Sequence, residues 1–368
     1  MMSLVPENVE RLIPYVPGKP VEELERELGI QNAVKLASNE NPVGPSPKAI
    51  DAMRAHASGV HRYPDAATWA LRSDLAAFHS RGASAVHMDE IVLGNGSNEL
   101  IDLICRTYAG PSDHAVIGVP SFVCYHLGLT AANVPFDAVP LREHLFWDLE
   151  AMAAKVTAKT KLFFVANPNN PTGTHVGRAA VERLLKELPE QVVVVLDEAY
   201  VQFADADDYV SGLELRGLRE RLIVLRTFSK AYGLAANRVG YAIGQKDVVS
   251  YLNRVRAPFN VNTLAQVAAR AALQDPEHVE RYVALNRTER ARITEALEGL
   301  GLRVAPSQAN FVFADFGRPN KEVYDRMLRM GVIIRPMPAP VDTWLRITVG
   351  RPEENDRLLE AVRELVAS

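Results

Sequence analysis

The sequence predicts an α/β protein with a large three-layer αβα domain, built on a mostly parallel sheet, and a smaller α+β domain. Three observations lead to this prediction: the chain has 368 residues, five short apolar runs recur in its middle, and the pattern changes after about Phe259. A chain of this length exceeds what one hydrophobic core usually serves, so two domains are expected. We expect an N-terminal arm at 1–36, the large domain at 37–258 and the small domain at 259–368.

Five apolar runs have the character of buried parallel strands. They are EIVLGNGS, HAVIGVPSF, KLFFVANPNNPTG, QVVVVLDEAY and RLIVLRTFSK, and each ends in polar or turn residues. Their near-continuous valine, isoleucine, leucine and phenylalanine suits strands covered on both faces, and helical patterns lie between several of them, as at 98–108 and 181–188. Ligands of such sheets bind outside the carboxyl ends of the strands. One pocket is therefore expected to collect the unusual residues at these ends: 94–98, Phe122, Asn170, Asp197 and Lys230.

The segments on either side of this sheet carry different patterns. The first begins with VPENVERLIPYVPGKP, which predicts an arm with a short helix. After Phe259, helices are expected at 261–273 and 278–300, then strands in FVFADF, GVIIRP and WLRITVG, and a closing helix at 353–366. Because no repeat or flexible linker separates the two domains, we expect them to share a large interface.

Composition excludes several classes of function. Hydrophobic residues make up 48% of the chain and charged residues 23%, and the net charge of −4 provides no basic field for nucleic acid. The longest apolar runs, such as 191–196, are far shorter than a membrane span, and the N-terminus has no signal-peptide core. The two cysteines, Cys105 and Cys124, form no disulfide framework, so a cytoplasmic location is expected. The nine histidines form no ligand cluster, which predicts that no metal is bound.

The segment RTFSKAYGLAANR, Arg226 to Arg238, carries the strongest chemical signal. It places Lys230 after two hydroxyls, Thr227 and Ser229, and before the guanidinium of Arg238. An amine can hold an aldehyde covalently, while hydroxyls and a guanidinium bind phosphate, so the segment predicts a site for pyridoxal 5'-phosphate. A solvated turn is the ordinary alternative for a Ser-Lys pair.

Other strand ends fit the same cofactor. The turn GNGSNE at 94–99 offers backbone N–H groups and a helix start to a phosphate, although an ordinary strand-to-helix turn explains it equally well. Asp197 ends a buried run, where a carboxylate needs a cationic partner, and a protonated pyridine nitrogen would be one. The acidic strand end of a P-loop ATPase is excluded because no GxxxxGK[ST] occurs. Tyr200 and Asn170 would reach the ring's phenolic oxygen, or else belong to the core and to a turn-rich loop.

These motifs resemble those of the fold type I pyridoxal-phosphate aminotransferases, and among them the histidinol-phosphate aminotransferase family. Matching stretches run along nearly the whole chain: LASNENPVGPSP (36–47), RYPD (62–65), the turn at Gly94, PNNPTG, DEAY, TFSKAYGLAANRVGY and LRITVG (345–350). The resemblance implies that Lys230 is the catalytic residue and binds the cofactor covalently, and that Asp197 pairs with the pyridine nitrogen. It implies a homodimer with shared active sites and these further cofactor contacts: Tyr200 and Asn170 at the ring oxygen, Phe122 stacked on the ring, Ser97, Asn98, Thr227, Ser229 and Arg238 around the phosphate, and Tyr63 from the neighbouring subunit. Relatives often carry tyrosine at position 122, so Phe122 keeps the aromatic face and loses a hydroxyl.

Substrate recognition rests on the resemblance and on one strand pattern. In LRITVG, Arg346 alternates with apolar residues, so it should point away from the buried face of its strand, toward solvent or a cleft. The resemblance places Arg335, Arg346 and Asn170 at the substrate, with Tyr15 of the arm closing the pocket. A guanidinium suits both a phosphate monoester and the carboxylate of glutamate. The implied reaction converts L-histidinol phosphate and 2-oxoglutarate to imidazole-acetol phosphate and glutamate.

Three alternatives stay open. An aromatic amino-acid aminotransferase shares the cofactor residues and differs in the pocket around the substrate side chain. A threonine-phosphate decarboxylase would release carbon dioxide without an oxo-acid acceptor. A non-catalytic cofactor-binding regulator is a different class of protein, although no helix-turn-helix extension or basic face is visible in the sequence.

Overall fold

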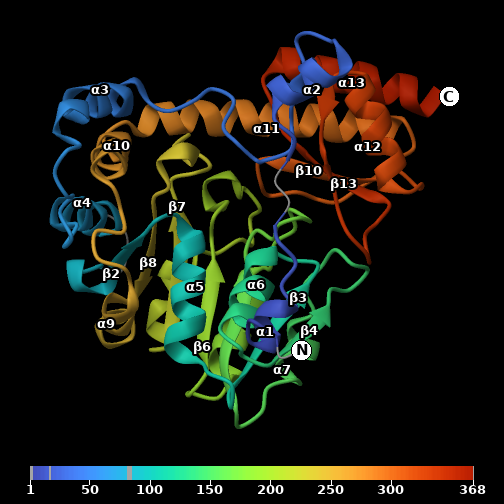
Figure 1. Cartoon of the computed structure of the whole chain (residues 1–368). Coiled ribbons are helices and arrows are strands. Elements are labelled where there is room, and N and C mark those ends of the chain that lie inside the picture. Colours follow the sequence, from blue (N-terminus) through green and yellow to red (C-terminus); the bar gives the residue numbers. More distant parts are fainter. Residues whose placement is uncertain (1–2, 16–17, 81–84, 368) are drawn as a thin grey trace.

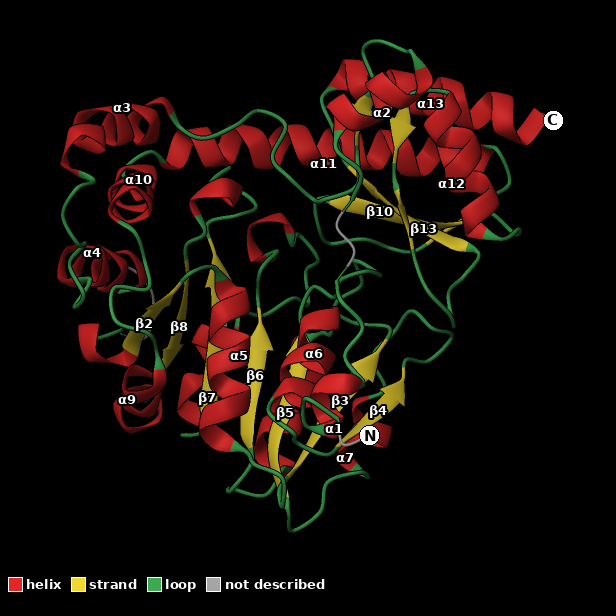
Figure 2. Cartoon of the chain, in the orientation of Figure 1, coloured by secondary structure: helices red, strands yellow, loops and turns green. Residues whose placement is uncertain are grey.

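The computed structural model describes residues 3–15, 18–80 and 85–367 and shows two bodies joined by one long helix, α11 (Pro276–Gly299) (Figure 1). The larger body is built around a seven-stranded sheet and the smaller around a four-stranded sheet. Figure 2 shows helices packed around both sheets. The predicted class, an α/β protein with a mostly parallel large sheet and a smaller α+β part, is confirmed.

All five apolar runs form strands of the large sheet. In spatial order the sheet contains β2 (Ile91–Gly94), β8 (Gly240–Gly244), β7 (Leu222–Thr227), β6 (Val193–Asp197), β5 (Thr160–Ala166), β3 (His114–Val119) and β4 (Phe136–Pro140). Neighbours from β7 to β4 pair in parallel, whereas β8 runs antiparallel to both β7 and β2. The carboxyl ends of the five predicted strands therefore lie at one edge of the sheet.

Helices cover this sheet on two faces. The chain moves one way along the sheet through β2, β3 and β4 and returns through β5, β6 and β7. Right-handed crossovers then put α5 (Ser97–Tyr108) and α6 (Val123–Ala131) on one face, and α7 (Leu149–Ala153) and α8 (Arg178–Glu187) on the other. One apolar cluster includes the central strands and the buried sides of these helices. The sheet is buried on both faces, which explains why its strands lack alternation.

Two strands of the large sheet were not predicted. The strand β8 has the sequence GYAIG, whose glycines interrupt the apolar run, and β4 has the sequence FDAVP, with an aspartate and a proline. Proline cannot donate to a ladder and is confined to edge strands, which is the position of β4. Composition alone therefore hides both strands.

Further helices surround the large sheet. They are α3 (Pro47–His56), α4 (Trp69–His79), α9 (Lys246–Val255), α10 (Thr263–Leu273) and the 3₁₀ turns Ala57–Gly59, Met88–Glu90, Val201–Phe203, Gly212–Leu218 and Ala235–Asn237. Helix α10 packs against α3 and α4, on the side of the large sheet. The exact domain edges, including the boundary at 258 and 259, stay a prediction.

The smaller body has an antiparallel sheet with its own core. Its order is β12 (Arg335–Pro336), β13 (Trp344–Thr348), β10 (Phe311–Asp315) and β9 (Arg303–Val304), and α12 (Asn320–Arg329) and α13 (Pro352–Ala367) pack beside it. A separate pair joins β1 (Val34–Lys35) to β11 (Val332–Ile333) in parallel. The segment before the large domain is thus tied to the small one.

The N-terminal arm contacts both bodies. The short helix α1 (Glu7–Glu10) lies on α6, where Asn8 Nδ2 donates to the carbonyls of Thr130 and Ala131 at 3.1 and 3.2 Å. Helix α2 (Val21–Leu28) buries Leu24 against Ile333 of the small body. Tyr15, which follows α1 in the chain, lines the pocket described below. No helix within the described part of the chain is both long and apolar enough to cross a membrane.

Candidate active site

A cavity of about 390 Å³ lies at the carboxyl ends of the large sheet's strands, as the topology of such sheets predicts. It is lined by most of the residues that the sequence nominated: Tyr15, Ser97, Asn98, Phe122, Asn170, Asp197, Tyr200, Thr227, Ser229, Lys230, Arg238 and Arg346. Tyr63 and Arg335 lie outside this lining. The residues at the carboxyl ends of the strands therefore line one cavity, as the sequence predicts.

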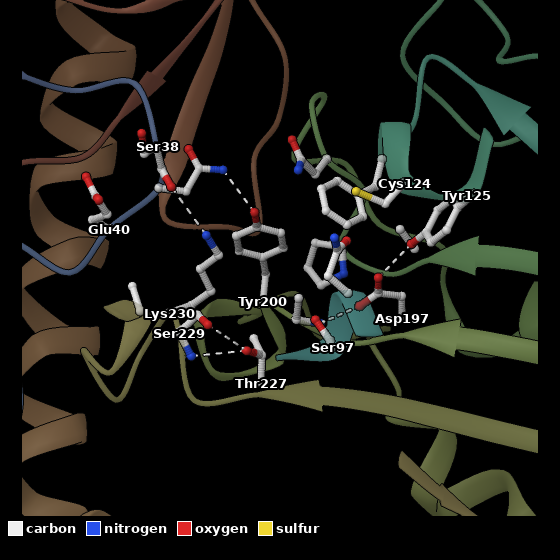
Figure 3. A pocket seen from close by; sticks show the side chains of 18 of the residues that line it. Ser38, Glu40, Ser97, Cys124, Tyr125, Asp197, Tyr200, Thr227, Ser229 and Lys230 are labelled. Carbon is white, nitrogen blue, oxygen red and sulfur yellow. Dashed lines mark hydrogen bonds between the residues drawn. The ribbon is translucent and has the colours of Figure 1, made fainter. Parts of the chain in front are cut away.

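Lys230 lies half-buried in this cavity, in the turn that follows β7 (Figure 3). Its Nζ donates to the carbonyl oxygen of Ser38 at 3.3 Å. The pKa of Lys230 is lowered to about 7, mainly by burial and also by the positive charges of Arg346 and Arg238, while the carboxylate of Glu40 acts in the opposite direction. An amine with this pKa can act as a nucleophile and as a proton carrier near neutral pH.

Asp197 is the last residue of β6 and is 4% exposed. Tyr125 Oη donates to Asp197 Oδ2 at 2.7 Å, and the backbone N–H of Ala199 donates to Oδ1 at 3.1 Å (Figure 3). Burial raises the pKa of Asp197 to about 6, although both hydrogen bonds act in the opposite direction. A cation placed against this carboxylate would be strongly stabilised.

Tyr200 lies beside Lys230 in the cavity, with the lysine Nζ 5.7 Å from the centre of its ring. Asn39 Nδ2 donates to the Tyr200 hydroxyl oxygen at 2.9 Å, which leaves the hydroxyl proton available for another acceptor. Burial raises the pKa of Tyr200 above its usual value. The hydroxyl therefore stays protonated at neutral pH and can donate to an oxyanion.

A set of hydrogen-bond donors gathers where β7 and α5 meet. Thr227 Oγ1 donates to Ser229 Oγ at 3.0 Å, and Arg238 NH1 donates to the same Ser229 oxygen at 3.3 Å. Ser97 starts α5, so its end of the helix presents backbone N–H groups. Gly96 precedes it with a φ of +77°, and a Cβ at this position would collide with the Arg238 guanidinium. This glycine is required for a guanidinium, hydroxyls and a helix N-terminus to converge, and this is the donor set of a phosphate site.

Arg346 faces the cavity and is 8% exposed. Its NH1 donates to Asn170 Oδ1 at 2.6 Å and its NH2 to the Ala37 carbonyl oxygen at 2.7 Å. Its Nε is buried without a hydrogen-bond partner among the described residues. The strand pattern was compatible with either solvent or a cleft around this side chain. In the structure the side chain lies in the cleft. A buried guanidinium with a donor to spare is suited to an anionic ligand.

Three consecutive residues of the segment before α3 contact side chains that line the cavity. The Ala37 carbonyl accepts from Arg346, the Ser38 carbonyl accepts from Lys230, and the Asn39 side chain donates to Tyr200. Thr348 of β13 holds Asn39 on its other side, since Asn39 N donates to Thr348 Oγ1 at 2.8 Å. The sequence analysis did not identify these positions, although Ala37 to Asn39 lie inside the stretch LASNENPVGPSP.

The first turn of α6 brings two aromatic residues to the cavity, Phe122 and Tyr125, which are three positions apart. Phe122 caps the helix and lines the cavity, and Tyr125 approaches it edge-on with ring centroids 5.8 Å apart. Tyr125 was missed by the sequence analysis. Its signal was present, because residues three apart on a helix share a face and Phe122 had been assigned to the pocket.

Three predicted residues differ in exposure from the buried set. Tyr63 is 82% exposed and stacks on Phe259 with ring centroids 4.6 Å apart, outside the cavity of its own chain. Tyr15 is 55% exposed at the cavity's open side, and the Arg335 guanidinium lies 5.3 Å from the centre of its ring. An exposed Tyr63 is compatible with the predicted contact to a neighbouring subunit.

The residues present fit pyridoxal phosphate. A buried amine of lowered pKa matches its aldehyde, and a buried carboxylate matches its ring nitrogen. A tyrosine hydroxyl that can donate matches its phenolic oxygen, and the converging donors around Ser229 match its phosphate. These four groups, as they are placed in the described chain, can hold the ligand without rearrangement.

Comparison with known proteins agrees with this chemistry. Residues 31–362 match the family Aminotransferase class I and II. The chain is 46% identical along its whole length to histidinol-phosphate aminotransferase 2 of Pseudomonas aeruginosa, of which it covers 98%. It is 45% identical to histidinol-phosphate aminotransferase of an Anaeromyxobacter species, with both chains fully covered. Histidinol-phosphate aminotransferase of Sinorhizobium meliloti, solved in complex with pyridoxal-5'-phosphate, superimposes with a TM-score of 0.90 at 29% identity, covering 100% of this chain and 98% of that one.

Proposed function

Because this chain belongs to the class I and II aminotransferase family, we propose that it transfers the amino group of L-histidinol phosphate to 2-oxoglutarate in histidine biosynthesis. The chain is a pyridoxal-phosphate-dependent transaminase by family. The observation that carries the choice of substrate is the 46% identity, over the whole length, to a protein named for this reaction. The products would be imidazole-acetol phosphate and glutamate.

When bound, pyridoxal phosphate supplies an aldehyde that carries the amino group and a protonated ring that accepts electron density from the amine-bearing carbon. The chain's own residues hold and polarise it. Asp197 would keep a proton on the ring nitrogen, and Tyr200 and Asn170 would donate to the ring oxygen. Phe122 would stack on the ring, while Ser97, Asn98, Thr227, Ser229 and Arg238 would bind the phosphate.

Lys230 carries out the proton transfers in this proposal. Its Nζ would hold the aldehyde, and as a free amine it would remove the proton from the amine-bearing carbon of the substrate. The pKa of about 7 means that a large fraction of the lysine is uncharged at neutral pH, as a base must be. Because the cavity buries this amine, few water molecules can compete for the proton.

Arg346 and Arg335 would bind the substrate's anionic end. Arg346 already holds Asn170 in place and retains one buried N–H donor without a partner in the described chain. Tyr15 lies over Arg335 at the open side of the cavity and would close the pocket over the ligand. The same guanidinium groups would accept the phosphate of one substrate and a carboxylate of the other in alternate half-reactions.

A single-turnover experiment tests this function. The purified holoenzyme is mixed with L-histidinol phosphate without an acceptor, and the visible absorption band of the bound cofactor is followed. We expect the band to disappear and to return when 2-oxoglutarate is added, with one glutamate formed per site. A band that persists with L-histidinol phosphate and disappears with phenylalanine would support the aromatic aminotransferase instead. Release of carbon dioxide from added threonine phosphate without acceptor would indicate the decarboxylase, and no response to any amine would indicate the regulator.

We also propose a homodimer with shared active sites, in which Tyr63 reaches the phosphate site of the neighbouring subunit. Its 82% exposure and its position outside the cavity of its own chain support this arrangement. The test mixes two weakly active variants, Lys230→Ala and Tyr63→Ala, after joint unfolding and refolding. A mixed dimer then contains one site with both native residues, so activity should rise to about a quarter of the wild-type value. No rise above the separate variants would contradict the shared site.

A cytoplasmic location completes the proposal. Cys105 is a buried free thiol, and Cys124 is a half-buried free thiol at the cavity. Two unpaired thiols suit a reducing compartment. Fractionation of the source cells, followed by measurement of aminotransferase activity in each fraction, would test this location.

A further inference from the structure

The first turn of α6 places two aromatic side chains at the cavity, and the proposed function uses only one. Phe122 and Tyr125 are three residues apart, so they point to the same side of the helix. Phe122 borders the open space, whereas Tyr125 is 1% exposed and stacks on Phe164 of β5, with ring centroids 4.9 Å apart. Figure 3 shows the Tyr125 hydroxyl directed at Asp197. The position of this hydroxyl calls for an explanation beyond packing.

Packing alone does not require a hydroxyl at this position. A phenylalanine would make the same stacking contact with Phe164, and burying a hydroxyl is unfavourable unless it forms a hydrogen bond. The Tyr125 hydroxyl forms one strong bond, 2.7 Å long, to Asp197 Oδ2. Among the described residues, the only other donor to this carboxylate is the Ala199 N–H, which donates to the opposite oxygen. Each oxygen of Asp197 therefore has one donor.

This bond changes the chemistry of the carboxylate. A tyrosine hydroxyl donates to an ionised carboxylate more strongly than to a protonated one, so it favours the charged form that a cationic ring nitrogen needs. Burial acts in the opposite direction and is the stronger effect, so the pKa of Asp197 is raised to about 6. Removing the hydroxyl would shift the balance further toward the protonated acid.

We propose that Tyr125 is a positioning residue that acts through Asp197, keeping this carboxylate ionised and aimed at the ring nitrogen of the bound cofactor. The inference rests on the role proposed for Asp197. Helix α6 would then support the cofactor at two points. Phe122 would pack against the face of the ring, and Tyr125 would hold Asp197 at the edge of the ring. The hydroxyl touches neither substrate nor reacting atoms, so its effect should be confined to steps that depend on the charge of the ring nitrogen.

The test compares the affinities of two cofactors for the Tyr125→Phe variant of the full chain. One is pyridoxal phosphate, and the other is its analogue with carbon in place of the ring nitrogen, which cannot carry the proton. Equilibrium dialysis of the cofactor-free protein gives both dissociation constants. Losing a hydrogen bond to a charged group should weaken pyridoxal phosphate binding by roughly 10- to 100-fold. The analogue should lose less than about threefold, since it makes no ion pair with Asp197.

Tyr241→Phe is the matched control. Tyr241 is also 1% exposed, its hydroxyl is hydrogen-bonded to His79 at 2.9 Å, and it does not line the cavity. This variant should bind both ligands as the wild type does. If Tyr125→Phe weakens the binding of both ligands equally, Tyr125 supports only the shape of the pocket, and the inference is overturned.

A double-mutant cycle separates this inference from the proposed function. In the Asp197→Asn background, adding Tyr125→Phe should change the dissociation constant of pyridoxal phosphate by less than about threefold, because the charge through which Tyr125 acts is absent. Two independent, additive losses would contradict the coupling. If Asp197→Asn itself binds the cofactor with wild-type affinity and remains active, the role of Asp197 in the proposed function fails. A loss in Asp197→Asn with none in Tyr125→Phe overturns only the inference about Tyr125.

Discussion

The cofactor half and the substrate half of the cavity are built in different ways. Asp197 and Thr227 are the last residues of adjacent central strands, and Asp197 is 4% exposed. Tyr15, by contrast, is 55% exposed on the arm, and Arg335 and Arg346 come from the small body. The proposed cofactor half is held by the main sheet, while the proposed substrate half combines the arm with the small body. The difference indicates a fixed platform for the cofactor and a boundary that can adjust to two substrates.

The largest expected effect is at the centre of the fixed half. Lys230→Ala should lower kcat by about 10⁴-fold or more, because both the covalent attachment and the proton carrier are lost. The phosphate site should still bind the cofactor, which absorbance after gel filtration would show. Lys246→Ala is the control, since Lys246 is 68% exposed and pairs with Asp89 at 2.8 Å. Turnover at the wild-type rate in the Lys230 variant would refute its assignment.

The substrate half is next, where the two arginines should differ. Arg346→Gln should lower kcat/KM for L-histidinol phosphate by about a hundredfold or more, since a buried guanidinium with two hydrogen bonds is removed. Arg335→Gln, at a half-buried position, should lower it by about tenfold or less. Steady-state kinetics of both variants measures the ratio. Equal losses would show that burial does not rank the two residues.

The pH dependence of stability tests how strongly the fixed half is buried. Because the pKa of Lys230 is lowered to about 7 in the folded state, its charge destabilises the cofactor-free protein fully below pH 7. This penalty fades as pH rises toward 10.5, the usual pKa of a lysine in the unfolded chain. The cofactor-free Lys230→Met variant should thus be more stable than wild type at pH 6, by roughly 2 kcal/mol. Urea unfolding at pH 6 and pH 9.5 should show the difference shrink, and a constant difference would exclude a titrating lysine.

The smallest effect is expected on the exposed arm. Tyr15→Leu should raise the KM for L-histidinol phosphate by about two- to fivefold, since it removes an exposed contact between the ring and Arg335. The affinity for pyridoxal phosphate should stay unchanged, because the ring lies over Arg335 rather than over the phosphate donors. A weakened cofactor site in this variant would mean that the two halves are less independent than their construction suggests.

The sequence predicted that the residues of the fixed half gather at one cavity, because their signals are local. Residues such as Asp197 and Thr227 end uninterrupted apolar runs, so the strand and the polar residue at its end are read from one short window. Strand β8 escaped because of its glycines, and β4 because it is an edge strand containing proline. The contacts of Arg346 could not be derived, since Asn170 is 176 residues away along the chain. Tyr125 could be placed beside Phe122 by spacing, but its approach to Asp197 depends on how α6 lies across the sheet.

The three consecutive residues Ala37, Ser38 and Asn39 have a consequence for how the chain tolerates change. The Ala37 carbonyl contacts the Arg346 guanidinium, the Ser38 carbonyl contacts the Lys230 amine, and the Asn39 side chain contacts the Tyr200 hydroxyl. Neighbouring Cα atoms are held about 3.8 Å apart by covalent bonds, so the spacing of these three residues fixes the separations among the three groups that they contact. Substitutions that merely loosen side-chain packing should leave this spacing unchanged. Inserting a single residue among the three would misalign two of the three contacts.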